Sequence, residues 1–514
     1  MSPHAARGRG RRATLHIVVA AAIAAAGAFA ALAVSSGPVG AAGPGCQAGD
    51  IEVTTNADSG AGSLRAAFAT ATATPGPSRI CVNSTVGSPI VLTSGELLYN
   101  SGTTPGLTLE GNGITVSGNN ASRVINNNTP GSLTLEHVTI TGGNTAAAGG
   151  GGGVVSAGAT NITDSVIAGN TATTGGGVAL RTAGWVLTVT NSAIVNNVST
   201  AGVGGGFLTF GEVTVSGSTV SGNRAGTFGG GGSPGSSIAV TDSIFFGNTA
   251  AEGGGGIDTN FTVTVTRSTF AANTAARGDG GAVDDGFGGD VTVVDSTMSG
   301  NTATGEPASQ GGAIHQSQGN VIVTNSTISG NTATGDMSQG GGIRENSGNV
   351  TLVYATVVEN SAAAGGNIRE ASGVLTAFGS VVALGGTNCT GGTTTSNGFN
   401  FSDDASCGFT AATDTQNAGD PALGALADNG GPTPTRLPQV GSPLIDAIAI
   451  ASCQADGAAG ITTDQRAVTR PQGAGCDIGA VEVAVPGPTP PGPIPPGPTP
   501  AAPTAVAVTP RFTG

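Results

Sequence analysis

The chain has 514 residues, more than one compact core can organise, so its length favours several domains or a solenoid that grows along one axis. It contains 91 glycines, and only 9% of its residues are charged. Its formal net charge of −14 repels phosphate backbones and anionic lipid, so we expect no nucleic-acid partner.

Residues 1–42 have the pattern of an export signal. Four arginines precede an apolar, alanine-rich run from Leu15 to Val34, and small residues follow at 39–42. This order is typical of a cleaved signal peptide. An uncleaved anchor is the alternative, because about 20 apolar residues can span a bilayer. We predict cleavage, a mature chain without a membrane span, and a secreted or cell-surface location.

Residues 43–132 are expected to form an N-terminal cap and the first coils of the fold. Ser63 can cap a short amphipathic helix that begins at Leu64. Such a helix would cover the open edge of a parallel sheet, which otherwise invites pairing with other chains. The stretch from Asp58 to Ala66 reads Asp-Ser-Gly-Ala-Gly-Ser-Leu-Arg-Ala. It resembles an N-terminal segment common to secreted bacterial β-helix proteins.

An imperfect repeat occupies residues 133–382. Apolar residues such as Val321 and Val323 alternate with polar ones, which is the period of a strand, and glycine-rich runs interrupt any helix. Each copy closes on an asparagine, every 25 to 30 residues: Asn144, Asn170, Asn197, Asn223, Asn248, Asn273, Asn301, Asn331 and Asn360. A repeat of this length predicts an all-β fold, a right-handed, single-stranded parallel β-helix resembling the pectin-lyase-like solenoid. Nine or ten such coils would extend roughly 45 Å.

Three columns of side chains are expected from stacking these copies. The asparagines would sit at one turn, where asparagine tolerates left-handed backbone angles and its amide can bond to the next asparagine. The outward Thr-x-Thr positions, such as Thr264 and Thr266, suit an exposed strand and are also what a flat ice-binding face needs. A serine column precedes the asparagines: Ser165, Ser192, Ser218, Ser243, Ser268, Ser296 and Ser326. We interpret the serine and asparagine columns as scaffold.

Two stretches of the repeat resemble the repeat of polymorphic outer-membrane proteins. Phe270-Ala-Ala-Asn273 followed by Gly280-Gly-Ala-Val283 matches both halves of that motif, and Gly311-Gly-Ala-Ile314 matches the second half. The resemblance implies a surface-exposed β-helix, often one with an adhesive role.

Residues 383–482 depart from the repeat and form an irregular C-terminal region. Asp420-Pro-Ala-Leu-Gly, Gly441-Ser-Pro-Leu-Ile-Asp, Thr463-Asp-Gln-Arg and Cys476-Asp-Ile-Gly-Ala-Val-Glu follow one another in order. This series resembles the choice-of-anchor Q domain of exported bacterial β-helix proteins, which implies surface attachment or secretion but no reaction. We expect Asp464, Arg466 and Asp477 to form a structural polar cluster. Residues 483–514 are a proline-rich tail, predicted to be a disordered spacer.

Six cysteines lie in the terminal regions and none lies in the repeats. In an exported chain they indicate three disulfide bonds, for which fifteen pairings are possible. Proximity in sequence favours Cys46–Cys81, Cys389–Cys407 and Cys453–Cys476.

Acidic residues are concentrated between Gly278 and Asp290. The four carboxylates are Asp279, Asp284, Asp285 and Asp290. Carboxylates grouped in this way can hold calcium, and two of them, Asp284 and Asp285, are the candidates for acid–base catalysis on a polysaccharide. We expect no other cofactor.

Asp284 also has a structural interpretation. It shares its repeat position with Asp258, His315, Arg344 and Arg369, one residue in each of five successive coils. Neighbouring members would form ion pairs between coils, or the column would line a ligand groove.

The loops that follow the asparagines vary most in length, and 302–310 and 332–339 are long and polar. Insertions in a solenoid project from one edge and change recognition without disturbing the core. The ligand-binding candidates of this region are Asp258, His315, Arg344, Glu306, Gln310, Asp336 and Gln339. Neutral variation in a tolerant loop is the alternative.

Together these patterns favour a non-catalytic adhesin or surface scaffold, expected to be a monomer that binds an extracellular or cell-surface glycan or protein. A polysaccharide lyase or glycoside hydrolase, with its site near Asp279–Asp290, is the alternative.

Overall fold

The computed structural model describes residues 43, 45–102, 105–455 and 457–483, which belong to one compact unit. The predicted signal, residues 1–42, and the tail from 484 to 514 lie outside the described residues. Among the described residues, no helix is both long and apolar enough to cross a membrane.

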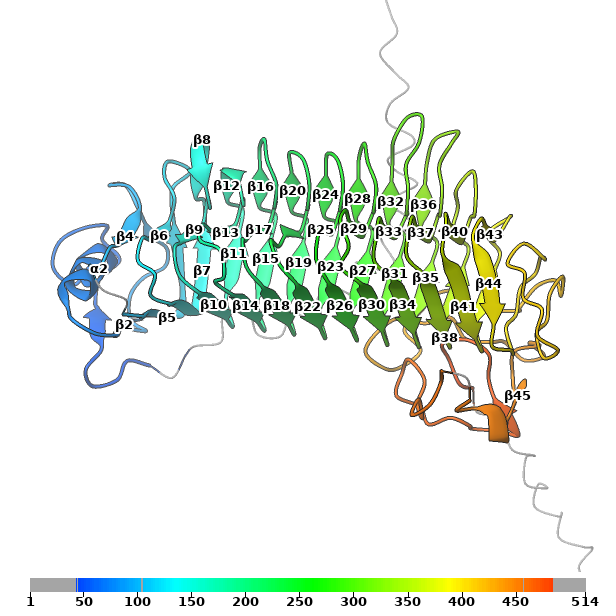
Figure 1. Ribbon diagram of the computed structural model, residues 1–514. Helices are drawn as coiled ribbons and strands as arrows, with labels where there is room; N and C mark the ends of the chain where they lie inside the picture. Colours follow the sequence, from blue (N-terminus) through cyan, green and yellow to red (C-terminus); the bar gives the residue numbers. More distant parts are fainter. Residues whose placement is uncertain (1–42, 44, 103–104, 456, 484–514) are drawn as a thin grey trace, which may run out of the picture. The chain divides into compact units, whose positions relative to one another are not determined.

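The predicted parallel β-helix is confirmed. Successive coils stack strand on strand, and three parallel sheets run side by side along the stack (Figure 1). The 12-stranded sheet holds β4 (Leu97–Tyr99), β6 (Ile125–Asn127), β9 (Val154–Ser156), β13 (Val178–Leu180), β17 (Phe207–Leu208), β21 (Gly232–Ser233), β25 (Ile257–Thr259), β29 (Val283–Asp285), β33 (Ile314–Gln316), β37 (Ile343–Glu345), β40 (Ile368–Glu370) and β43 (Cys389–Thr390).

The largest sheet has 24 strands, because most coils contribute two strands separated by a bend. Its strands are β1 (Ile51–Val53), β2 (Ser78–Val82), β3 (Ile90–Val91), β5 (Leu107–Ser117), β7 (Leu133–Thr141), β10 (Thr160–Thr163), β11 (Val166–Ala168), β14 (Leu187–Thr190), β15 (Ala193–Val195), β18 (Val213–Ser216), β19 (Thr219–Ser221), β22 (Ile238–Thr241), β23 (Ile244–Phe246), β26 (Val263–Thr266), β27 (Thr269–Ala271), β30 (Val291–Val294), β31 (Thr297–Ser299), β34 (Val321–Thr324), β35 (Thr327–Ser329), β38 (Val350–Val353), β39 (Thr356–Val358), β41 (Val374–Phe378), β42 (Val381–Ala383) and β44 (Thr393–Ser396).

The third sheet is built from the short strands that follow the asparagines. They are β8 (Asn144–Gly150), β12 (Thr171–Thr174), β16 (Val198–Ser199), β20 (Arg224–Ala225), β24 (Thr249–Ala250), β28 (Thr274–Ala275), β32 (Thr302–Ala303) and β36 (Thr332–Ala333). The parallel stacking thus begins before residue 133 and continues through β43 and β44.

The core fills the inside of the coils, as the alternating pattern predicts. Val321 and Val323 are fully buried, while Ile322 between them is only partly covered. Equivalent positions stack from coil to coil, and the rings of Phe245 and Phe270 lie parallel with centroids 4.6 Å apart. A residue in each coil therefore packs on its counterpart in the next.

The asparagine column forms a buried ladder. From Asn170 to Asn331, each side-chain amide donates to the Oδ1 atom of the next asparagine, as Asn248 does to Asn273 at 2.9 Å. The prediction that Asn144 belongs to this column is wrong, because Asn144 pairs with Thr171 and Gly143 occupies the position next to Asn170. The expectation that asparagine itself adopts the left-handed backbone is wrong. That conformation belongs to the residue just before it, such as Gly247 with φ of 60° or Ala272 with φ of 54°. The preceding residue makes the turn, which leaves the buried amide free to bond along the ladder.

Glycine is required where the chain enters the 12-stranded sheet. Gly311 has φ of 64°, which glycine adopts without steric cost. At Gly312 a Cβ atom would lie 2.1 Å from the carbonyl oxygen of Gly341 in the next coil. The glycine pair thus sets both the turn and the close contact between coils.

The predicted helix at the N-terminal end is present as α2 (Leu64–Ala73). Ser63 caps it, because its Oγ accepts a hydrogen bond from the Ala66 amide at 3.2 Å. Leu64, Ala67, Phe68 and Ala71 are buried against the first strands. All three predicted disulfides, Cys46–Cys81, Cys389–Cys407 and Cys453–Cys476, are formed.

The C-terminal region returns to pack on the outer face of the 24-stranded sheet, below β34, β38 and β41 in Figure 1. It includes the antiparallel pair β45 (Ile448–Ala449) and β46 (Gly475–Cys476) and the 3₁₀ turn η1 (Ile450–Ser452). Gln465 holds it in place: its amide donates to Thr297 Oγ1 at 2.8 Å, and its carbonyl accepts from Thr327 Oγ1 at 2.7 Å.

The polar residues of this region have structural partners. Asp464 pairs with Arg466 at 2.8 Å and also accepts the backbone amide of Glu482 at 2.9 Å. Arg470 is buried, lies 3.1 Å from the Glu482 carboxylate and stacks 4.2 Å over the Tyr354 ring. These contacts tie the C-terminal region to itself and to the β-helix.

Candidate functional site

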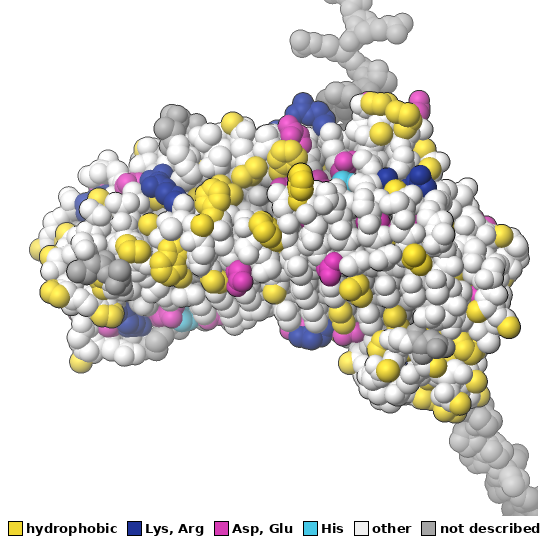
Figure 2. All heavy atoms as spheres, viewed as in Figure 1, with side chains coloured by type: hydrophobic (Ala, Val, Ile, Leu, Met, Phe, Trp, Pro, Cys, Tyr) yellow, Lys and Arg dark blue, Asp and Glu magenta, His cyan; other side chains and the backbone are white. Residues whose placement is uncertain are grey.

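One row of charged side chains crosses five coils on the outer face of the 12-stranded sheet. Parallel pairing places Asp258 of β25 beside Asp284 of β29, Asp284 beside His315 of β33, and His315 beside Arg344 of β37, with Arg369 of β40 next. Each lies between two inward-facing positions, so it points away from the core. The row passes from acidic to basic along the stack, and Figure 2 shows acidic, histidine and basic side chains gathered on this face. We call these five residues the charged row.

Asp284 and His315 form the centre of the charged row. Their Oδ1 and Nδ1 atoms are 2.7 Å apart, and the other imidazole nitrogen lies 3.1 Å from the amide of Asn346. Burial by itself would lower the pKa of His315, but the hydrogen bond and charge of Asp284 outweigh it and raise the pKa above its usual value. The pair is therefore held together most strongly when the imidazole is protonated.

The basic half of the row is tied to the long loops. Arg344 Nε donates to the side-chain oxygen of Gln310 at 3.0 Å, and the backbone amide of Gln310 donates to the Asp279 carboxylate at 2.7 Å. Arg369 reaches Gln339 in the same way at 3.4 Å, and Gln310 and Gln339 are backbone neighbours in adjacent coils. The glutamines at the loop ends thus position the guanidinium groups.

The two long loops stack on each other, as the adjacent coils predict. Ser309 Oγ donates to the Thr334 carbonyl at 2.7 Å, and the Met337 amide donates to the Pro307 carbonyl at 3.1 Å. Figure 1 shows the loops after β32 and β36 rising above their neighbours. Their tips carry exposed side chains: Glu306, Asp336 and Met337. These loops therefore present one surface beside the charged row.

Asp258, at the acidic end of the row, has an unusual carboxyl group. Burial, followed by the charges of Asp284 and Asp285, raises the pKa of Asp258 to about 8. It therefore carries its proton at neutral pH and can donate a hydrogen bond, whereas an ordinary aspartate only accepts.

A second, buried row lies one residue further along each strand and was not predicted. It contains Asp285, Gln316, Glu345 and Glu370 in register. Burial, and then the neighbouring Glu345, raises the pKa of Glu370 to about 8, so Glu370 is protonated at neutral pH. The sequence does contain a signal for this row, the Ile-Arg-Glu triplet at 343–345 and again at 368–370. Its repetition places two glutamates at the same position of adjacent coils.

The four carboxylates proposed to bind calcium have separate partners. Asp284 faces His315, Asp285 is buried at the turn, Asp279 accepts from Gln310, and Asp290 accepts from the Asn320 amide at 2.8 Å. In the described part of the chain, the one cluster with metal-ligand spacing is Cys46, Asp50 and Cys81, whose cysteines form a disulfide. A calcium site at Asp279–Asp290 stays a prediction.

No protein-family model, curated protein or solved structure matches this chain. The fold and the charged row together define a parallel β-helix protein with a row of charged side chains across one of its faces.

Proposed function

We propose that this chain is an exported, non-catalytic β-helix protein, an adhesin or surface scaffold, that binds an extracellular glycan or protein through the charged row. The observation that carries the proposal is the register of five charged side chains, ordered from acid to base over five consecutive coils. The three disulfides support export, because such bonds persist in oxidising compartments.

The spacing of the row suits an extended ligand. Neighbouring coils are about 4.8 Å apart, so the row extends roughly 20 Å along the stack. Its members stand on strands, and hydrogen bonds from Gln310 and Gln339 orient the two arginines. Side chains held in this way lose little freedom when a ligand binds, which favours affinity.

The partners within the row favour binding over chemistry. Asp284 and His315 satisfy one another, and Arg344 is occupied by Gln310. Asp284, His315 and Arg344 are 9%, 6% and 7% exposed, so a ligand would contact only their outermost atoms. The neutral Asp258 supplies one donor at the acidic end.

One observation favours the alternative, a glycoside hydrolase. Asp258, protonated at neutral pH, sits next to Asp284 across one strand spacing of about 4.8 Å. Retaining glycosidases use such a pair, an acid and a nucleophile whose carboxyl groups are close together. Asp258 would be the acid and Asp284 the nucleophile, whereas the buried Asp285 faces the other side of its strand.

The two functions separate in a paired screen of the exported chain. Binding is measured on a glycan array and on whole cells, and degradation is measured as release of reducing ends or unsaturated sugars from polysaccharides. For the binding protein, Arg344→Gln should weaken binding about tenfold, because one charged hydrogen-bond donor is lost. Arg267→Gln is the matched control, since Arg267 is exposed and pairs with Asp242 on another face.

Unchanged binding by Arg344→Gln would remove the charged row from the proposal. Product release that disappears in both Asp258→Asn and Asp284→Asn would establish the hydrolase instead. Both substitutions keep side-chain size, so a fold control by circular dichroism should show no change.

A further inference from the structure

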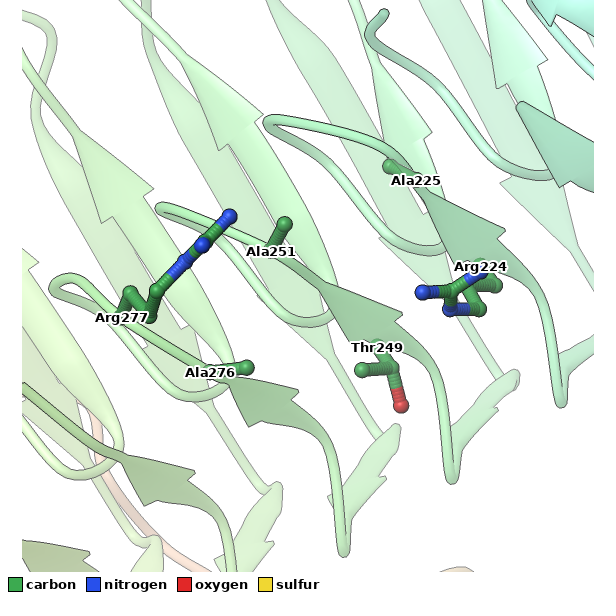
Figure 3. Close-up of a pocket in the computed structure, with 6 residues that line it drawn as sticks. All are labelled: Arg224, Ala225, Thr249, Ala251, Ala276 and Arg277. Atoms are coloured by element: carbon green, nitrogen blue, oxygen red, sulfur yellow. The ribbon is translucent and has the colours of Figure 1, made fainter. Parts of the chain in front are cut away.

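A hollow lies on a different face of the β-helix from the charged row, on the 8-stranded sheet. Its volume is about 280 Å³. Its lining comes from three consecutive coils, β20, β24 and β28 and the residues just after them: Arg224, Ala225, Thr249, Ala251, Ala276 and Arg277 (Figure 3). The charged row stands on the 12-stranded sheet, so the two places share no residue.

Two arginines stand at opposite ends of this hollow. Figure 3 shows their guanidinium groups extending toward each other over the coil that carries Thr249 and Ala251. Both arginines are exposed, and within the described residues neither guanidinium has a hydrogen bond or an ion pair. The chain has 31 acidic residues against 17 basic ones, so two free cations facing each other are a local exception.

The floor between the arginines is small and mostly apolar. The side chains of Ala251 and Ala276 are at least partly exposed there, whereas the Ala225 side chain is buried, and the Thr249 hydroxyl is the one neutral polar side chain at the hollow. A volume just below the roughly 300–1,000 Å³ range of small-molecule sites suits a slender ligand and not a folded partner. The C–H face of a sugar ring can rest on the methyl groups of Ala251 and Ala276 while its hydroxyls reach threonine.

We propose that this hollow binds a linear anionic glycan that runs along the stack, with one oxyanion on Arg224 and another on Arg277. The backbones of the two arginines are two coils, or roughly 10 Å, apart along the stack, and the guanidinium groups extend over the coil between them, so the two oxyanions would be separated by less than that along the stack. The planar guanidinium fork matches carboxylate and sulfate oxygens alike.

The test uses the full chain and three polymers: dextran sulfate, polygalacturonate and uncharged dextran. Calorimetry at low and moderate salt should show binding of one or both anionic polymers, weaker at higher salt, and none of uncharged dextran. The anionic polymer that binds identifies the oxyanion as sulfate or carboxylate.

Variants assign the binding to the hollow. Arg224→Gln and Arg277→Gln should each weaken binding about tenfold, and the double variant should abolish it. The matched control is Arg181→Gln with Arg267→Gln, which removes two exposed arginines elsewhere and changes the net charge equally. The Arg344→Gln variant of the charged row should bind normally, so this site can fail or succeed independently of the proposed function.

Two results would overturn the proposal. One is the absence of binding to both anionic polymers. The other is equal weakening by the two double variants, which would mean that overall charge and not this hollow attracts the polymer. The variants lie at the surface, so unchanged melting curves exclude misfolding as the cause.

Discussion

Asn248 offers the sharpest test of how the coils are held together. Its Oδ1 accepts from the backbone amide of Asn223 at 3.1 Å and from the Asn223 side chain at 3.0 Å. Its own amide donates to the Val220 carbonyl and to Asn273 Oδ1, both at 2.9 Å. The residue is fully buried, so no water replaces these contacts without rearrangement. The substitution Asn248→Ala removes all four.

The magnitude follows from the groups left without partners. Two donors on Asn223 and the Val220 carbonyl lose theirs, whereas Asn273 Oδ1 keeps the Asn248 backbone amide at 3.1 Å. A buried polar group left unsatisfied costs about 1–3 kcal/mol. Three such groups predict that the free energy of unfolding falls by about 3 kcal/mol or more.

The assay is guanidinium-induced unfolding followed by far-UV circular dichroism, at an unchanged denaturant slope. Asn260→Ala is the control: Asn260 is exposed, and its side chain makes no hydrogen bond among the described residues, so its effect should stay within about 0.5 kcal/mol. A loss below about 1 kcal/mol for Asn248→Ala would show that the ladder relaxes or hydrates, and would refute the reasoning.

Three further predictions concern other parts of the chain. Gln465→Ala should release the C-terminal region from the sheet and expose it to limited proteolysis, because both halves of its amide bond to the β-helix. Burial raises the folded pKa of Glu370 from 4.5 to about 8. The protonated carboxyl group therefore contributes its full stabilisation below pH about 4.5, and this contribution is lost as the pH rises to about 8. Glu370→Gln should flatten that decline in the free energy of unfolding. Shortening loops 302–310 and 332–339 together to the length of Thr249–Glu252 should leave the melting temperature nearly unchanged and weaken ligand or cell binding.

Each of these has a clear contrary outcome. Proteolysis of the Gln465 variant at the wild-type rate would show that the region is held by its apolar contacts alone. A decline with pH that persists in Glu370→Gln would assign it to other buried carboxyls, such as Asp258. Unaltered binding after loop shortening would leave neutral variation as the explanation of the loop lengths.

The fold was predictable because its cause is local and repeated. A period of two within each strand and a repeat of 25 to 30 residues predict stacked coils. Stacking buries Val321 and Val323 together with the residues at the same positions in the other coils. Register then follows from the alignment of the copies, which is why the order Asp258, Asp284, His315 was visible in advance. The disulfides were predictable because each bond joins two cysteines that are close together along the chain.

The sequence by itself therefore determined the β-helix, the ladder of asparagines and the composition of the charged row. Only the tertiary structure showed that Gly247, and not Asn248, adopts the left-handed backbone at the turn. The repeat pattern marks the position of the corner, but it does not say which residue turns the chain and which side chain bonds along the ladder. The tertiary structure alone placed Gln465 against Thr297, since no periodic signal links residues 168 positions apart. It also left Arg224 and Arg277 facing each other, because the direction of a long side chain depends on the loops packed around it and not on its place in the repeat.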